Sequence, residues 1–186
     1  MKARTRSFIV TAIASATVLF AAGCGTQETI FSSQLETIRT WITSQSDNNG
    51  PDYEEVASGV YRAIILPDDG RGAPFIAAGD SLYVWYEIYQ FSSGFQRNNT
   101  SALIYTNKKE KMPTNVRWDD DVLKLRLGDG SLLRGVEKSL DGCAQSDTVS
   151  VVLTSSNAYG KVQMQQVPPN TPLIWFIDVE KVIKNE

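Results

Sequence analysis

Several short motifs follow one another between residues 127 and 179, and together they constrain the fold more than any other part of the chain. They are Leu127-Gly128, Arg134-Gly135, Ala158-Tyr159-Gly160 and Val167-Pro168-Pro169. Glycine and proline in the first, third and fourth of these motifs indicate turns between regular elements. The apolar run 173–179 predicts a final strand.

In order and spacing these motifs resemble the FKBP-type peptidyl-prolyl isomerase domain. That family has a Leu-Gly strand end, a short helix containing Arg-Gly, an Ala-Tyr-Gly loop and an Ile-Pro-Pro turn before its last strand. The resemblance covers roughly 59–179 and is loose between 89 and 123. It implies an FKBP-like α+β fold, in which a curved, mostly antiparallel sheet wraps over one short helix. It also implies an apolar pocket that binds proline-containing polypeptides without a cofactor.

The hydrophobic pattern independently indicates strands. Apolar and more polar residues alternate over 82–89 and again over 148–154, which is the period of a strand with one buried face. Two further strands are expected over 59–66 and 173–179. Mostly antiparallel strands with one short helix between them indicate an α+β architecture.

Two helices are expected. The first covers 30–42 and is amphipathic, because its apolar residues recur at helical spacing. Its apolar stripe either packs on the domain's own surface or serves as a docking or dimerising face. The second covers 131–140, with Ser131 as a plausible N-cap. Its sheet-facing residues are expected to be Leu133, Val136 and Leu140.

The resemblance implies candidate site residues position by position. Tyr86 matches the strand tyrosine that lines the family's pocket, and Tyr159 matches the loop tyrosine whose hydroxyl bonds the ligand carbonyl. These two are the candidate catalytic residues. The candidate substrate-binding residues are Ile104, Tyr105, Leu123, Leu132, Leu133, Val136, Val167 and Trp175. All eight are of ordinary core types, so only their joint spacing indicates a site.

Several of these positions depart from the family pattern. Ile104 and Tyr105 stand where the family has phenylalanine and aspartate, and Leu123 replaces another phenylalanine. Val136 stands where the family has a tryptophan beneath the proline ring, which removes a large aromatic surface. An aliphatic pocket still excludes water, so we expect a weak isomerase. The alternative is a non-catalytic FKBP-like module that binds a protein of the cell envelope.

The N-terminus has the pattern of a secretory signal peptide, with basic residues at 2, 4 and 6 before the apolar run 8–22. Ala21-Ala22-Gly23-Cys24 resembles a bacterial lipobox, in which the chain is cut before a cysteine that then carries lipid. The alternative is an ordinary secretory signal with an incidental cysteine. We expect a signal peptide over 1–23 and a lipid anchor at Cys24. A helix and linker over 24–51 and an FKBP-like domain over 52–186 would follow.

This anchor predicts attachment to a membrane, since several acyl chains hold a protein stably on a bilayer. Gly25-Thr26 supplies no aspartate beside the cysteine, the residue that retains many lipoproteins at the inner membrane. We therefore expect an outer-membrane lipoprotein that faces the periplasm and acts on exported proteins. The cell surface stays open as an alternative.

Composition excludes several classes of function. The chain has no histidine, which excludes histidine-based hydrolases and the common zinc enzymes. Without residues 1–23, which hold three basic and no acidic residues, 15 basic residues face 21 acidic ones and the net charge is −6. This charge argues against a nucleic-acid partner. Asp119 to Asp121 are consecutive rather than alternating, so no metal site is expected. Cys143 is expected to be a small core residue.

Overall fold

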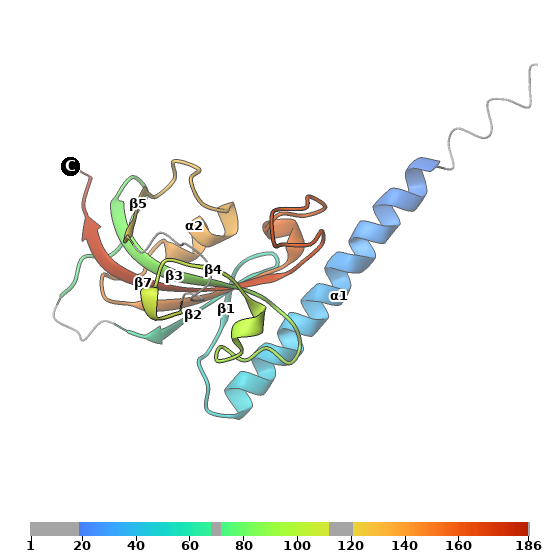
Figure 1. The fold of residues 1–186 in the computed structure, drawn as a ribbon, viewed down its shortest axis with the longest axis horizontal. Coiled ribbons are helices and arrows are strands. Elements are labelled where there is room, and N and C mark those ends of the chain that lie inside the picture. Colours follow the sequence, from blue (N-terminus) through green and yellow to red (C-terminus); the bar gives the residue numbers. More distant parts are fainter. Residues whose placement is uncertain (1–18, 68–71, 112–120, 186) are drawn as a thin grey trace, which may run out of the picture.

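A computed structural model describes residues 19–67, 72–111 and 121–185, with side chains from residue 26 onward except that of Lys111. In this part of the chain a seven-stranded antiparallel sheet curves around one short helix, and a long helix lies against its other side (Figure 1). The predicted α+β class is confirmed. The helices and strands are α1 Leu19–Asp47, β1 Glu54–Ala57, β2 Val60–Leu66, β3 Ser81–Gln90, β4 Leu103–Thr106, β5 Leu123–Arg126, α2 Arg134–Leu140, β6 Thr148–Leu153 and β7 Leu173–Ile183. Single 3-10 turns occur at Thr100–Ala102, Lys109–Lys111 and Ser155–Asn157.

The strand order in the sheet is β1-β2-β6-β7-β3-β4. The long strand β3 pairs along one edge with β7, from Ser81 opposite Ile183 to Gln90 opposite Leu173. Its other edge is shared, because β5 pairs with its first half and β4 with its second half. All four predicted strands are confirmed, and β7 continues four residues beyond Val179.

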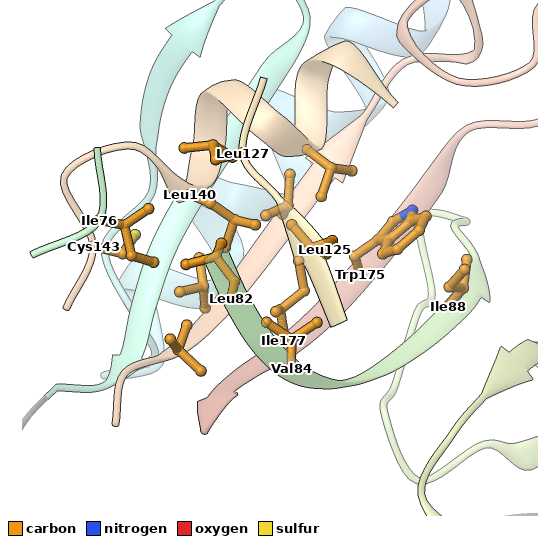
Figure 2. Packing of buried hydrophobic residues seen from close by; sticks show 14 of the residues in the cluster. Ile76, Leu82, Val84, Ile88, Leu125, Leu127, Leu140, Cys143, Trp175 and Ile177 are labelled. Atoms are coloured by element: carbon orange, nitrogen blue, oxygen red, sulfur yellow. The ribbon is translucent and has the colours of Figure 1, made fainter. Parts of the chain in front are cut away.

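The main core lies between the concave face of the sheet and α2. Figure 2 shows Leu82, Val84 and Ile177 of the sheet directed toward the same core as Leu140 of α2. Cys143 belongs to this core and is fully buried, as predicted. Burial raises the pKa of its thiol to about 11, so it stays protonated at neutral pH.

Gly135 explains why the Arg-Gly motif stands in α2. A Cβ atom at this position would lie 2.8 Å from Cδ2 of Leu153 and 3.1 Å from Cγ2 of Val60. The helix therefore approaches the sheet more closely than any residue with a side chain would allow. The expected N-cap at Ser131 is wrong: α2 begins at Arg134, and the backbone N–H of Ser131 donates instead to the carboxylate of Asp129.

The helix α1 is longer than the predicted 30–42, and it runs across the expected boundary between residues 23 and 24. It ends in a glycine-containing cap, where Asn49 takes a left-handed φ of 57° and Gly50 donates to the carbonyl of Gln45. Within the described residues, no helix combines the length and apolarity needed to cross a bilayer.

The stripe of α1 packs on the domain itself, which supports the first of the two alternatives. Ile38 is fully buried, and Trp41 makes edge-on ring contacts with Tyr53, Phe91 and Phe95. This second core covers the convex face of the sheet. The alternation predicted strands with only one buried face. This prediction is wrong for β6, all of whose residues are buried, and for the second half of β3.

A buried carboxylate forms the polar centre of this second side. Glu87 is fully buried and accepts hydrogen bonds from Arg97 at 2.6 Å, Tyr89 at 2.6 Å and Lys108 at 3.1 Å. Lys108 also pairs with Asp178 of β7 at 2.5 Å. Burial alone would raise the pKa of Glu87, but these bonds outweigh it and lower the pKa to about 2. The network fixes both basic residues to β3.

This network predicts an acid-sensitive part of the stability. The pKa of Glu87 is lower in the folded than in the unfolded chain, so its contribution is present above pH 4.5 and is lost as the pH falls toward 2. The shift corresponds to about 3 kcal/mol. We expect Glu87→Gln to lower the free energy of unfolding at pH 7 and to flatten its dependence between pH 4.5 and 2, measured by urea unfolding. Equal pH slopes in both proteins would contradict this assignment.

Candidate functional site

A cavity of about 610 Å³ opens on the concave side of the sheet. Eight of the ten predicted catalytic and substrate-binding residues line it: Tyr86, Ile104, Tyr105, Leu123, Leu132, Tyr159, Val167 and Trp175. They come from β3, β4, β5, β7, the segment before α2 and the two loops before β7. The structure therefore brings together residues that are up to 89 positions apart in the sequence.

One wall of the cavity is aromatic. The ring of Tyr86 stacks on Tyr105 with centroids 5.8 Å apart, and on Trp175 with centroids 5.7 Å apart. The interplanar angles are 15° and 26°, so the three rings are roughly parallel. Such stacking adds to the stabilisation from burial and limits the freedom of each ring. Tyr105, which stands where the resemblance places an aspartate, thus contributes a ring to the wall.

The backbone of Tyr86 is held from the neighbouring edge by two polar side chains. Its N–H donates to Oδ1 of Asn107 at 2.7 Å, and its carbonyl accepts from the hydroxyl of Thr106 at 2.7 Å. Asn107 is buried, and its Nδ2 donates to the carbonyls of Val84 and Asp121. Asn107 therefore replaces backbone pairing where β4 has ended and β5 has not yet begun.

The loops before β7 supply the other tyrosine. Tyr159 follows the 3-10 turn Ser155–Asn157, and the N–H groups of Ala158 and Gly160 both donate to the carbonyl of Ser155. Val167 is buried and lies at the end of a small loop closed by paired backbone bonds with Met164. These bonds fix the part of the chain from which Tyr159 and Val167 reach the cavity.

Two predicted substrate-binding residues do not line the cavity. Val136 is fully buried in the main core, and Leu133 packs against that core at the N-cap of α2. Five further residues line the cavity without having been predicted: Ile88, Ser131, Met164, Gln165 and Gln166. Ile88 could have been found from its alternation with Tyr86. The stretch 164–166 lies between two motifs and carries no pattern of its own.

Trp175 has an unusual polar atom. Its indole Nε1 is buried and has no hydrogen-bond partner among the described residues, while its ring lies in the cavity wall. A buried donor without a partner costs about 1–3 kcal/mol. The stacking of the ring on Tyr86 and the burial of its large apolar surface offset this cost.

None of the described lining residues carries a charge at neutral pH. Four aromatic rings and several aliphatic side chains provide apolar surface, and the tyrosine hydroxyls and the two glutamines provide hydrogen-bonding groups. The site holds no candidate for charged acid–base or metal chemistry among these residues. Asp119 and Asp120 of the acidic trio lie outside the described residues. The arrangement suits a small, largely apolar ligand that carries a few hydrogen-bonding groups.

Comparison with known proteins places this chain in a family. The pattern of FKBP-type peptidyl-prolyl cis-trans isomerases matches residues 76–180, more than half of the chain. The chain belongs to the FKBP-type peptidyl-prolyl cis-trans isomerase family. This confirms the resemblance inferred from the motifs of residues 127–179.

Curated relatives include FK506-binding protein 2A of Rhizopus delemar, 34% identical over 64 residues, which are 34% of this chain and 37% of the relative. FK506-binding protein 5 of Dictyostelium discoideum is 27% identical over 135 residues, 70% of this chain but 7% of that protein. The chain thus spans a minor part of both relatives' length.

Two solved structures share the fold at 18% sequence identity. The N-terminal domain of FKBP42 from Arabidopsis thaliana has a TM-score of 0.55 and covers 72% of this chain and 93% of its own. A peptidyl-prolyl cis-trans isomerase from Pseudomonas syringae has a TM-score of 0.56 and covers 85% of this chain and 96% of its own. The FKBP-like fold is therefore confirmed.

The hydrogen bonds of Asn107 predict a structural role for this residue. Asn107→Ala would leave the N–H of Tyr86 and the carbonyl of Val84 without the partner that the amide supplies. Unpaired buried groups cost about 1–3 kcal/mol each, so the free energy of unfolding should fall by at least about 1 kcal/mol in urea unfolding. The matched control is Asn48→Ala, which removes one exposed bond and should change it by less than about 0.5 kcal/mol. Equal losses in the two variants would contradict this role.

Proposed function

We propose that this protein catalyses cis–trans isomerisation of prolyl peptide bonds in exported proteins, with low efficiency. The observation that carries the proposal is the uncharged cavity with Tyr86, Tyr105 and Trp175 in one wall and Tyr159 in its lining. Membership of the FKBP-type family supports the same reaction. The reaction needs no charged catalyst, because no covalent bond is made or broken.

The physical basis is the lower polarity of the twisted amide. Rotation about an X-Pro bond has a barrier of about 18–20 kcal/mol, because conjugation is lost at the twisted state. A dry apolar cavity suits this state better than the planar ground state, and each 1.4 kcal/mol or so of such differential binding gives about a tenfold rate increase. The resemblance assigns the hydroxyl of Tyr159 to the carbonyl of the bound peptide. A hydrogen bond there would orient the substrate across the aromatic wall.

Low efficiency follows from two positions. The resemblance places a tryptophan beneath the proline ring at the position of Val136, whose side chain here is fully buried in the core. Tyr105 stands where the family has aspartate, and its ring stacks on Tyr86. The same two positions favour the second candidate, a module that binds proline-containing segments of an envelope protein without catalysis.

The test is a prolyl-peptide isomerisation assay on the purified protein beside its Tyr159→Phe variant. Loss of one neutral hydrogen bond should lower kcat/KM about threefold to tenfold. The matched control is Tyr83→Phe, since Tyr83 lies on β3 beside Lys124 and does not line this cavity. A wild-type rate equal to background, with retained peptide binding, would leave only the non-catalytic candidate. An unchanged rate in Tyr159→Phe would overturn the role of this hydroxyl.

We also propose that lipid on Cys24 tethers the protein to the outer membrane, facing the periplasm. The lipobox-like sequence before Cys24 supports this anchor. The helix α1 would then connect the lipid to the domain. At 1.5 Å per residue, the ten residues from Cys24 to Gln34 correspond to about 15 Å of helix. The substrates would be newly exported polypeptides within reach of this tether.

Substitution of the anchoring cysteine tests this assignment. Cys24→Ser should move the protein from the membrane fraction to the soluble fraction of disrupted cells and abolish incorporation of labelled fatty acid. The matched control is Cys143→Ser, which changes the buried thiol and should leave both readouts as in the wild type. Membrane retention and labelling that persist in Cys24→Ser would exclude the anchor.

A further inference from the structure

The N-terminal helix lies outside the residues that match the family, yet it contacts the two loops that carry site residues. Figure 1 shows the orange-to-red loops before β7 beside α1. The contacts come from one side chain above all. Oε1 of Gln34 accepts from the backbone N–H of Ser155 at 2.8 Å and from its hydroxyl at 2.9 Å. Nε2 of Gln34 donates to the carbonyl of Asn170 at 2.8 Å.

Ser155 is the residue on which the Tyr159 turn closes. Its carbonyl accepts from the N–H groups of Ala158 and Gly160, at 3.0 and 2.8 Å. Ser155 is itself buried, so its N–H and hydroxyl need partners within the protein, and Gln34 supplies an acceptor to both. Gln34 thus fixes the start of the turn that presents Tyr159 to the cavity.

Asn170 completes a closed ring of hydrogen bonds. Its N–H donates to the carbonyl of Gly160 at 2.6 Å, while its own carbonyl is held by Gln34. It has a left-handed φ of 58°, a conformation that asparagine tolerates better than most residues. Gln27 of the same helix also contacts this residue, because its Nε2 donates to Oδ1 of Asn170 at 3.4 Å.

We propose that Gln34 is a positioning residue of the site, and that α1 is therefore a functional part of it. The inference rests on the proposed isomerase function for its effect on rate, although its structural part stands apart from that function. One amide side chain bridges the turn before Tyr159 and the loop after Val167. Tyr159 and Val167 themselves line the cavity. Without the bridge, the two loops lose the hydrogen bonds that join both of them to α1. Binding and orientation of a prolyl peptide then weaken.

The test compares Gln34→Ala with Gln34→Glu and a control on the same helix. The carboxylate of Gln34→Glu can still accept from Ser155 but cannot donate to Asn170, so it separates the two arms of the bridge. The control is Arg39→Ala, because Arg39 also joins α1 to the domain, through Tyr61 and Glu55, but contacts neither loop. Arg39 is largely exposed, so its removal tests docking of the helix alone.

The first readout is amide hydrogen exchange, which resolves local opening. In Gln34→Ala the N–H of Ser155 and those of residues 158–160 and 170 should exchange about tenfold faster, while β6 and β7 keep their protection. Gln34→Glu should affect residue 170 more than residues 155–160. Arg39→Ala should leave both loops unchanged. Unchanged loop protection in Gln34→Ala, or equal loss in Arg39→Ala, would overturn the proposal.

The second readout is kinetic. Gln34→Ala should lower kcat/KM for a prolyl peptide about threefold to tenfold, and Gln34→Glu should recover part of the loss. A full rate in Gln34→Ala, despite faster loop exchange, would overturn the positioning role. A wild-type protein with no isomerase activity would refute the proposed function but not the bridge. In that case the exchange data, and the affinity of the same peptide for wild type and Gln34→Ala, decide the inference.

Discussion

Tyr86 and Trp175 stack because β3 and β7 pair in an antiparallel register that sets them diagonally opposite each other. Tyr86 is opposite Ile177, and Trp175 is two residues away on the same face of the sheet. A shift of one residue would move both rings to the other face. That shift is opposed on both sides, since one face packs on α2 and the other on α1. The aromatic wall of the cavity thus depends on a strand pair whose register is fixed by two separate cores.

The same register keeps charge out of the cavity. Glu87 lies between Tyr86 and Ile88 in β3, so alternation directs it to the convex side, where Arg97 and Lys108 neutralise it. One face of β3 therefore carries the ion pairs of Glu87, and the other face lines an uncharged cavity. Strand alternation thus keeps the ion pairs of Glu87 on the side of the sheet away from the cavity.

Much of the fold and of the cavity lining could be predicted from the sequence. The features that were missed depend on contacts between distant parts of the chain. The motifs of residues 127–179 carried the resemblance that predicted the fold. Its pattern over 59–179 gave ten candidate residues, of which eight line the cavity. The buried convex face was missed because it depends on α1, which packs across the sheet from far away in the sequence. Spacing correctly predicted that Val136 faces the sheet, but the resemblance also placed it in the pocket. The close approach of α2 that Gly135 permits leaves Val136 in the main core instead. Asn107 has no local signal, since its role comes from the gap between β4 and β5.

One aromatic ring of the family pattern is absent from this site. The resemblance places a tryptophan on the short helix, at the position of Val136. Here that residue is a core valine, and the rings belong to the sheet: Tyr86 on β3, Tyr105 on β4 and Trp175 on β7. Apolar enclosure, rather than the identity of any one ring, is what favours a twisted amide, so the same property can be supplied from another element of the fold. The rings are then positioned by strand register, while Tyr159 is positioned by loops held against α1, and the site depends on both sides of the sheet.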